Sequence, residues 1–261
     1  MDLGLTGKVA LITGGSEGIG KAAALSMAAE GAKVTICARR ADVLDAAADE
    51  IRAATGGEIL AVSADVSTQE GVQSVLDATI SQFGRLDILV NNAGTSAAGP
   101  FESVTDEGWQ TDLDLKLFGA IRFSRLAIPH MREQNGGRII NVTNLGAKAP
   151  GAASVPTSVS RAAGIALTKA MSKEFAADNI LVNTVCIGLI KSGQHEARFE
   201  RTKGDNPGAT LEGMYESMGS RVPLGRVGEA EEAGDVIAFL ASGRASYLTG
   251  IAVNIDGGTS P

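Results

Sequence analysis

The sequence predicts an α/β protein built on a doubly wound parallel sheet of about seven strands, with helices on both faces. Short apolar runs alternate along the chain with longer segments of helical periodicity. The apolar runs are nearly continuous, as in strands that are buried on both faces of a parallel sheet. Because crossovers between parallel strands are right-handed, this alternation also indicates how the helices cover the sheet.

The expected elements follow one another in a regular order. Strands are expected where the apolar runs lie, at Val9–Thr13, Lys33–Cys37, Ile59–Ser63, Ile88–Asn91, Arg138–Val142, Leu181–Cys186 and Ala252–Ile255. Helices are expected where good helix formers recur, at Lys21–Ala29, Asp42–Ala54, Gln69–Phe83, Asp112–Gln134, Pro156–Ala177 and Ala230–Ala241. The segment Lys191–Arg226 mixes glycine, proline and many charges, so we expect it to be irregular.

Size and composition narrow the class of protein. With 261 residues and 44% apolar content, the chain can form one large domain over residues 1–261. A formal net charge of −7 without a dense run of cations argues against nucleic acid as a partner. No apolar run approaches the roughly 20 residues that span a bilayer, and the N-terminus lacks a secretory pattern. We therefore expect a soluble protein without a membrane partner.

Cysteine and histidine are sparse. Cys37 and Cys186 each lie within an apolar stretch, which is typical of buried, reduced thiols and favours a cytoplasmic location. With two histidines, two cysteines and no metal-like spacing, we expect no metal site.

A glycine-rich turn follows the first expected strand. The segment Thr13–Gly20 reads Thr-Gly-Gly-Ser-Glu-Gly-Ile-Gly and leads into an alanine-rich helix. Glycines allow the backbone to approach a pyrophosphate closely, and the helix N-terminus near Gly18 directs unpaired N–H groups at it. Taken alone, the motif is also compatible with a tight turn that binds nothing.

Further motifs accompany this turn. They are Asp65-Val66 after the third strand, Asn91-Asn92-Ala93-Gly94 after the fourth, Gly188-Leu-Ile-Lys-Ser192 after the sixth, and Leu248-Thr-Gly250 with Val253-Asn-Ile-Asp-Gly-Gly258 near the end. Together with Thr13-Gly14-x-x-x-Gly18-Ile19-Gly20 they resemble the short-chain dehydrogenase/reductase (SDR) family over essentially the whole chain. Ile187 replaces the proline usual in that family.

The resemblance implies a Rossmann-type dinucleotide-binding domain and an NAD(P)-dependent oxidoreductase. It also implies that residues 191–226 form a substrate lid. The cofactor contacts that it implies are Gly14, Ser16, Gly18, Ile19, Gly20, Arg39, Asp65, Val66, Asn92, Ala93, Gly94, Arg161 and Ser192.

The end of the second strand bears on the choice of cofactor. NAD-dependent members of the family carry an acid there, whereas this chain has Ala38 followed by Arg39 and Arg40. A cation suits the 2′-phosphate of NADP, which we predict to be preferred over NAD. Glu17 in the turn would oppose this by repelling the phosphate, and the arginines could also be a solvated helix start.

The family's catalytic positions are all changed. Where its members carry Asn, Ser, Tyr and Lys, alignment of the surrounding motifs places Lys116, Asn144, Thr157 and Arg161. An alignment shift cannot restore the tyrosine, because the chain's only tyrosines are Tyr215 and Tyr247. The resemblance therefore implies an atypical active site.

These replacements differ in what they can do. Thr157 is an alcohol without acidity near neutral pH, and a positioned acid typically contributes about 10²–10⁴-fold in rate. Arg161 lies one helical turn away and can bind ribose hydroxyls while keeping its charge. Lys116 is the best candidate acid if burial beside Arg161 lowers its pKa, although a surface or interface lysine is an equal alternative. Tyr215 and His195 in the irregular segment are further candidates, for which a solvated or packing role is the alternative.

Three functions remain open. The first is an NADP-dependent oxidoreductase with a non-standard active site, acting on a small carbonyl, enone or imine-type substrate. The second is a lyase or isomerase that performs no net redox on the same fold. The third is a catalytically inactive nucleotide-binding subunit or sensor.

The resemblance also implies a homotetramer or homodimer. Members of the family assemble on the two long helices, here Asp112–Gln134 and Pro156–Ala177. The second of these is rich in small residues that permit close helix–helix approach.

Overall fold

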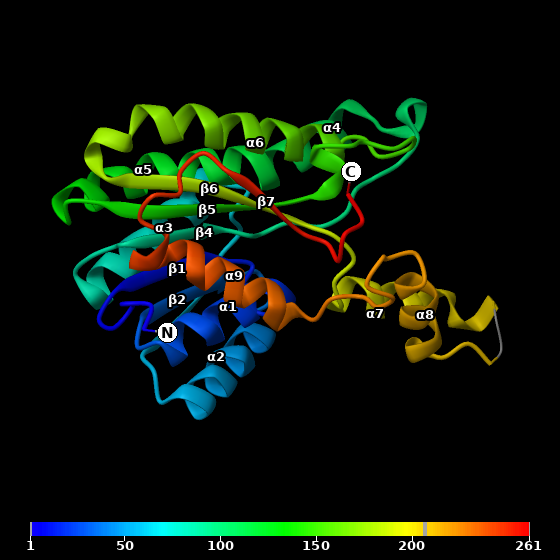
Figure 1. Ribbon diagram of the computed structural model, residues 1–261, viewed down its shortest axis with the longest axis horizontal. Helices are drawn as coiled ribbons and strands as arrows, with labels where there is room; N and C mark the ends of the chain where they lie inside the picture. Colours follow the sequence, from blue (N-terminus) through cyan, green and yellow to red (C-terminus); the bar gives the residue numbers. More distant parts are fainter. Residues whose placement is uncertain (1, 206–207, 261) are drawn as a thin grey trace.

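A computed structural model describes residues 2–205 and 208–260 of the chain (Figure 1). It contains a seven-stranded sheet in the order β3-β2-β1-β4-β5-β6-β7, and every neighbouring pair is parallel. Helices cover both faces, so the predicted Rossmann-type α/β fold is confirmed. The strands are β1 (Val9–Thr13), β2 (Lys33–Ala38), β3 (Ile59–Ser63), β4 (Ile88–Asn91), β5 (Gly137–Asn144), β6 (Ile180–Ile187) and β7 (Ala252–Ile255).

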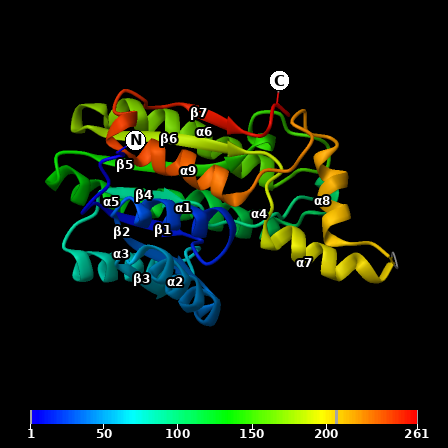
Figure 2. The same cartoon turned by 60° about the horizontal axis from the view of Figure 1, so that its bottom comes forward.

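Most of the helices lie in two layers, one on each face of the sheet (Figures 1 and 2). The α-helices are α1 (Gly18–Ala29), α2 (Ala41–Thr55), α3 (Gln69–Phe83), α4 (Asp106–Leu113), α5 (Gly119–Glu133), α6 (Thr157–Glu174), α7 (Gly193–Thr202), α8 (Leu211–Gly219) and α9 (Ala230–Ala241). Two of them, α7 and α8, lie beyond the sheet. Helices α1, α2 and α9 pack on one face, where Ile12 belongs to the core cluster. Helices α3, α5 and α6 pack on the other face with Leu11. Successive residues of one strand thus enter opposite cores, which explains the continuous apolar runs.

The prediction of one continuous helix over Asp112–Gln134 was wrong in one respect. The segment consists of the end of α4, a π-helical turn over Asp114–Phe118, and α5. A π turn accommodates one extra residue in a helix and is common at functional sites. Lys116 lies in this turn and is only 8% exposed. Periodicity in the sequence could not reveal the turn, because its flanking helices follow the same pattern.

The segment predicted to be irregular contains two helices, α7 and α8. Ser192 and Thr210 cap them by accepting hydrogen bonds from the backbone of His195 and Gly213. No side chain of α7 is buried, so its charges face solvent and its sequence lacks an apolar stripe. Both helices project beyond the carboxyl end of β6 (Figures 1 and 2).

Side-chain hydrogen bonds hold the crevice between β1 and β4, where the strand order reverses. The amide of Asn92 donates to the carbonyls of Thr13, at 2.9 Å, and Gly14, at 3.0 Å. The Thr13 hydroxyl accepts from the backbone N–H groups of Asn92 and Ala93, each at 3.0 Å. In open parallel sheets this switch point is where ligands bind.

Both cysteines are buried and free, and burial raises the pKa of Cys37 to about 12. Within the two described ranges, no group of three or more His, Cys, Asp or Glu side chains could hold a metal ion. Nor does any helix in those ranges combine the length and apolar character needed to cross a membrane.

Asp87, just before β4, generates a prediction about acid stability. Its carboxylate accepts hydrogen bonds from Val9 N at 3.0 Å, Lys8 at 3.2 Å and Arg85 at 2.8 and 2.6 Å. Burial alone would raise the pKa of Asp87, but the bonds from Arg85, Val9 and Lys8 lower it overall. The stabilisation is therefore present above the unfolded pKa of about 3.9 and is lost as pH falls through the lower folded value.

We expect Asp87→Asn to reduce the free energy of unfolding at neutral pH by about 1–3 kcal/mol. The difference from wild type should shrink below about pH 4, and urea denaturation across pH 3–7 measures it. Asp49→Asn is a matched control, because the Asp49–Arg52 ion pair is exposed. A constant difference across this pH range would contradict the assignment.

Candidate active site

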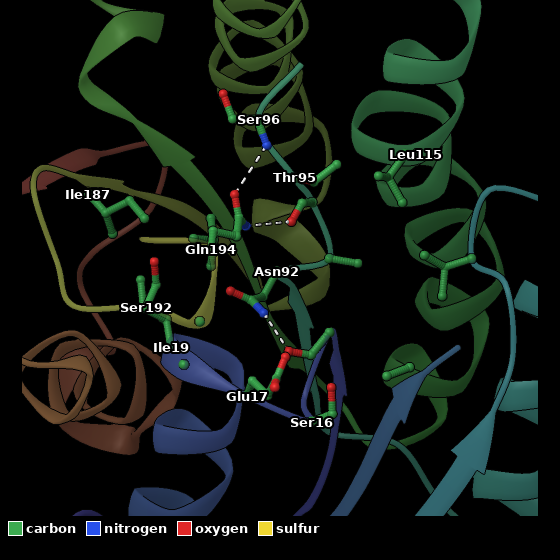
Figure 3. Close-up of a pocket in the computed structure, with 18 of the residues that line it drawn as sticks. Ser16, Glu17, Ile19, Asn92, Thr95, Ser96, Leu115, Ile187, Ser192 and Gln194 are labelled. Carbon is green, nitrogen blue, oxygen red and sulfur yellow. Dashed lines mark hydrogen bonds between the residues drawn. The ribbon is translucent and has the colours of Figure 1, made fainter. Parts of the chain in front are cut away.

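A cavity of about 680 Å³ opens at the carboxyl ends of the central strands (Figure 3). Its walls come from the glycine turn, the ends of β2 and β5, the segments after β3, β4 and β6, and the start of α6. Of the residues predicted for the site, all but Gly20 and Lys116 line it. Those that do are Gly14, Ser16, Gly18, Ile19, Arg39, Asp65, Val66, Asn92, Ala93, Gly94, Asn144, Thr157, Arg161 and Ser192.

The glycine turn leaves a helix N-terminus open to the cavity. Gly14 and Gly18 adopt positive φ angles of 67° and 54°. A Cβ at Gly20 would lie 2.2 Å from the Gly14 carbonyl oxygen, so Gly20 serves close packing. The side chain of Glu17, the N-cap residue of α1, makes no capping hydrogen bond. The first N–H groups of α1 therefore remain available to an anion.

Charged side chains surround the end of the cavity beside β2. Arg40 forms an ion pair with Glu17, at 2.6 Å between Nη2 and Oε2. Hydrogen bonds from the Ser67 backbone and hydroxyl, together with the attraction of Arg39, lower the pKa of Asp65. Arg39 has no ion pair in the described part of the chain. Glu17 is thus balanced by Arg40, and Arg39 adds a positive charge.

At the other end, a buried polar cluster lies beneath the cavity. We call Asp112, Lys116, Thr157 and Ser160 the Asp112 cluster. The side chains of Asp112 and Lys116 form an ion pair, and each is only 1% exposed. Ser160 Oγ donates to Asp112 Oδ2 at 2.6 Å, and Lys116 Nζ donates to Thr157 Oγ1 at 2.9 Å.

The Thr157 hydroxyl is occupied by neighbours on every side. It accepts from Lys116 and from the Ala97 N–H at 3.0 Å, and it donates to Asp112 Oδ1 at 3.3 Å. A hydroxyl has one donor and two acceptor positions, so this arrangement uses all three.

Lys116 does not reach the main cavity. It lines a separate cavity of about 10 Å³ behind the cluster. Burial lowers the pKa of Lys116, and the charge of Arg161 adds to this, while the hydrogen bond and attraction of Asp112 oppose it.

The polar side chains of Arg161 and Asn144 line the main cavity. Arg161 donates through Nη1 to the Val142 carbonyl, and a Cβ at Gly94 would lie 2.5 Å from Nη2. Burial lowers the pKa of Arg161 to about 10, so the guanidinium stays charged at neutral pH. Arg161 Nε and Asn144 Oδ1 are buried without a hydrogen-bond partner in the described structure. Both atoms are inaccessible to solvent, so the cavity is bordered by other atoms of these two side chains.

The α7 helix is tied to the opposite rim through Gln194 (Figure 3). Its Oε1 accepts from Ser96 N at 3.2 Å, and its Nε2 donates to the Gly94 carbonyl at 3.3 Å. Sequence reasoning missed both Gln194 and Asp112. Nothing in the sequence marked Gln194, whereas Asp112 stands four residues before Lys116 on a predicted helix, a spacing that places side chains together.

Comparisons with known proteins show what the chain is similar to. A family described as enoyl-(acyl carrier protein) reductase matches residues 14–260. The 3-oxoacyl-[acyl-carrier-protein] reductase FabG of Thermotoga maritima is 34% identical, over 97% of this chain and 98% of its own. The oxidoreductase UcpA of Salmonella typhimurium is also 34% identical, over 98% and 95%.

Two solved structures are similar to this chain over nearly their whole length. The L-sorbose reductase of Gluconobacter frateurii, complexed with NADPH and L-sorbose, has a TM-score of 0.95 at 38% identity and covers 99% of this chain and 98% of its own. YwfH, an NADPH-dependent reductase involved in bacilysin biosynthesis, has a TM-score of 0.89 at 32% identity, covering 97% and 98%.

The fold and the site define an oxidoreductase of the Rossmann type that depends on a nicotinamide dinucleotide. The chain belongs to the short-chain dehydrogenase/reductase family, whose members use NAD or NADP.

The buried ion pair of the Asp112 cluster generates a second prediction. We expect Asp112→Ala to lower the free energy of unfolding by about 3–5 kcal/mol, because it leaves the Lys116 charge buried without a partner. The double variant Asp112→Leu with Lys116→Met removes both charges and should lose less than the single variant. Urea denaturation measures both.

Asp114→Ala is the matched control on the adjoining turn. Asp114 pairs with Arg122, and its side chain is 28% exposed, so the change should cost less than about 1 kcal/mol. Wild-type stability in Asp112→Ala would show that Lys116 has another counter-charge or is neutral.

Proposed function

We propose that this protein is an NADP-preferring oxidoreductase with a non-standard reaction centre, acting on a small carbonyl or enone compound. One observation carries the proposal. A single cavity joins an uncapped helix N-terminus suited to phosphate with a far end lined by the polar side chains of Arg161 and Asn144. A dinucleotide with a polar substrate would satisfy both ends.

The proposed cofactor contacts follow the cavity wall. Backbone N–H groups from Gly14 to Gly20 would bind the pyrophosphate, and Asp65 with Val66 would hold the adenine. Segment 92–94 and Arg161 would face the ribose beside the nicotinamide, and Ser192 its amide. When bound, the nicotinamide would supply or accept the hydride.

The preference for NADP is supported by the charges beside β2. Glu17 would repel a 2′-phosphate, but its ion pair with Arg40 offsets that charge. Arg39 remains to donate charge-assisted hydrogen bonds to the phosphate. The NADPH named with L-sorbose reductase and with YwfH is consistent with this choice.

The charge at the reaction centre bears on the substrate. Within the Asp112 cluster the charges of Lys116 and Asp112 cancel, so the guanidinium of Arg161 leaves a net positive charge. This charge stabilises the negative oxygen that develops when a carbonyl or enone accepts hydride. It repels a cationic imine, which we therefore rank below the other two substrate classes.

A second candidate is a catalytically inactive nucleotide-binding subunit. The enclosed hydroxyl of Thr157 favours it, because the position of the family's proton donor is closed by three neighbours. Turnover separates the two candidates, since both would bind the dinucleotide.

We also propose a lid and a homo-oligomer. The lid comprises residues 191–226 of the single domain 1–261, of which residues 1, 206, 207 and 261 lie outside the described residues. The Gln194 contacts connect the start of the lid to the cavity rim. We propose the homodimer or homotetramer from the family to which the chain belongs, with the two long helices as its interface. Light scattering on the purified protein tests the assembly, and a monomer would contradict it.

Binding titrations of NADPH and NADH test the cofactor assignment. We expect wild type to bind NADPH more tightly, and Arg39→Ala to weaken NADPH binding about 10–100-fold through loss of a charged hydrogen bond worth about 1.5–3 kcal/mol. NADH affinity should stay unchanged. Arg125→Ala removes an exposed arginine on α5 and should alter neither affinity.

Turnover is then measured as NADPH oxidation with L-sorbose, 2,3-butanedione and an acetoacetyl thioester. Equal affinity for both dinucleotides would contradict the preference. Tight binding without turnover of any of these three carbonyl compounds would favour the inactive subunit.

A further inference from the structure

We propose that His195, in the first turn of α7, is the catalytic acid and base of this site and exchanges the proton with the substrate oxygen. The inference rests on the proposed hydride-transfer function. It assigns to the lid a task that the family's pattern places on α6.

The Asp112 cluster cannot exchange protons with the cavity. The Thr157 hydroxyl has both acceptor positions and its donor position filled. The side chain of Lys116 is 1% exposed, points to Asp112 and Thr157, and borders only the small rear cavity. A proton from Lys116 would have to cross the Thr157 hydroxyl, breaking its bonds to Asp112 or Ala97.

A proton donor to the substrate must be a titratable side chain that lines the main cavity. In the described ranges the titratable side chains there are Glu17, Cys37, Arg39, Arg40, Asp65, Arg161 and His195. The first five belong to the glycine turn and to the ends of β2 and β3, which the proposed cofactor would cover. Arg161 holds its proton with a pKa of about 10. His195 is the remaining group that changes charge near neutral pH.

Position also favours His195. Gln194, the preceding residue, bonds to Gly94 and Ser96 across the cavity rim (Figure 3). The next residue of that segment, Ala97, donates to Thr157. One short segment therefore holds both the start of α7 and the position of the family's proton donor, and His195 borders the same cavity.

The orientation of the His195 ring bears on which nitrogen exchanges the proton. Nδ1 is buried without a hydrogen-bond partner among the described residues. The ring meets Tyr215 of α8 edge to face, with centroids 6.3 Å apart at 72°. Because Nδ1 is enclosed and the residue still borders the cavity, the geometry assigns the exchanged proton to Nε2.

Tyr215 itself does not border the cavity. Its hydroxyl is buried without a hydrogen-bond partner among the described residues, and Lys191 Nζ lies 5.6 Å from its ring centroid. Burial raises the pKa of Tyr215 above its ordinary value. We assign Tyr215 as a positioning residue that holds the imidazole.

The charges around His195 set its working range. Burial lowers the pKa of His195 below 6.5, the Ile190 carbonyl opposes this, and Arg198 on α7 adds to it. Charged and titratable groups on the neighbouring elements are Glu17 on the turn, Lys191 paired with Glu229, Glu196 on α7, Tyr215 and Glu212 on α8, and Arg161 across the cavity. His195 is therefore mostly neutral at pH 7, and protonated below its pKa.

Reduction of a ketone needs a hydride at carbon, which the reduced nicotinamide supplies as it is oxidised, and a proton at oxygen. The carbonyl π electrons move to oxygen, and that oxygen takes the proton from Nε2 of the His195 imidazolium, leaving neutral imidazole. In alcohol oxidation, neutral His195 accepts the hydroxyl proton. Reduction should therefore slow as pH rises through the His195 pKa, while oxidation should quicken.

Replacement of His195 tests the assignment, with His130→Asn on α5 as the matched control. We expect His195→Asn and His195→Gln to lower kcat for L-sorbose or 2,3-butanedione about 10²–10⁴-fold and to remove the ionisation below pH 6.5 from the rate profile. The Kd for NADPH and the melting temperature should not change. Using two variants guards against misfolding in one of them.

A quinone probe separates proton donation from a structural role. Reduction of 9,10-phenanthrenequinone gives an acidic hydroquinone whose oxygen needs little help from an acid, so both variants should keep most of this rate. Loss of quinone and ketone reduction together would overturn the assignment. Unchanged ketone kinetics in both His195 variants would also overturn it. A loss of ketone reduction of about 10²–10⁴-fold in Lys116→Met, with none in the His195 variants, would do so too.

A third readout does not depend on turnover. The chain has two histidines, so His130→Asn leaves the imidazole of His195 as the single histidine signal in an NMR titration. We expect a pKa below 6.5 and a change in the signal on adding NADP⁺. A signal insensitive to NADP⁺, in protein shown to bind it, would overturn the location at the site. Failure of wild type to bind NADPH would instead overturn the proposed function, and with it this role.

Discussion

A lysine ammonium that is cut off from water needs a matching anion nearby, and Asp112 meets that need for Lys116. Both side chains are 1% exposed, so the pair can persist only if its remaining polar positions are also filled. Ser160 and Thr157 fill them, which draws the first turn of α6 against the π-helical turn before α5. The Thr157 hydroxyl is then unavailable to the cavity above it.

The parallel sheet makes this departure compatible with dinucleotide binding. The glycine turn, Asn92 and the uncapped start of α1 are positioned by β1 and β4, and none of them contacts the Asp112 cluster through a hydrogen bond. The glycine turn and the Asp112 cluster are therefore held by separate hydrogen bonds, although the segment after β4 contacts both ends of the cavity through Asn92 and Ala97. Replacement of the groups at one end could leave the other end intact, and the reaction centre that we propose could then differ from the family's while the binding motifs remain.

The sequence predicted the fold well because its strands are buried on both faces and so appear as unbroken apolar runs. The positions of Asn144, Thr157 and Arg161 around one cavity were also predictable, since the strand and helix that carry them follow recognisable motifs. The environment of Lys116 was not predictable from the sequence. The π turn is invisible in the periodicity, and the sequence reasoning considered Arg161 as its neighbour rather than Asp112. The contacts of Gln194 depend on the placement of α7, which apolar patterning could not give because no residue of that helix is fully buried.

The central claim is that the Asp112 cluster stays closed when the dinucleotide binds. A crystal structure of the protein with NADPH at a resolution that separates side-chain conformers tests it directly. We predict that Lys116 Nζ and Ala97 N will both remain within about 3 Å of Thr157 Oγ1, with Asp112 still paired to Lys116. A Thr157 hydroxyl turned toward the nicotinamide, with Lys116 released into the cavity, would contradict the account.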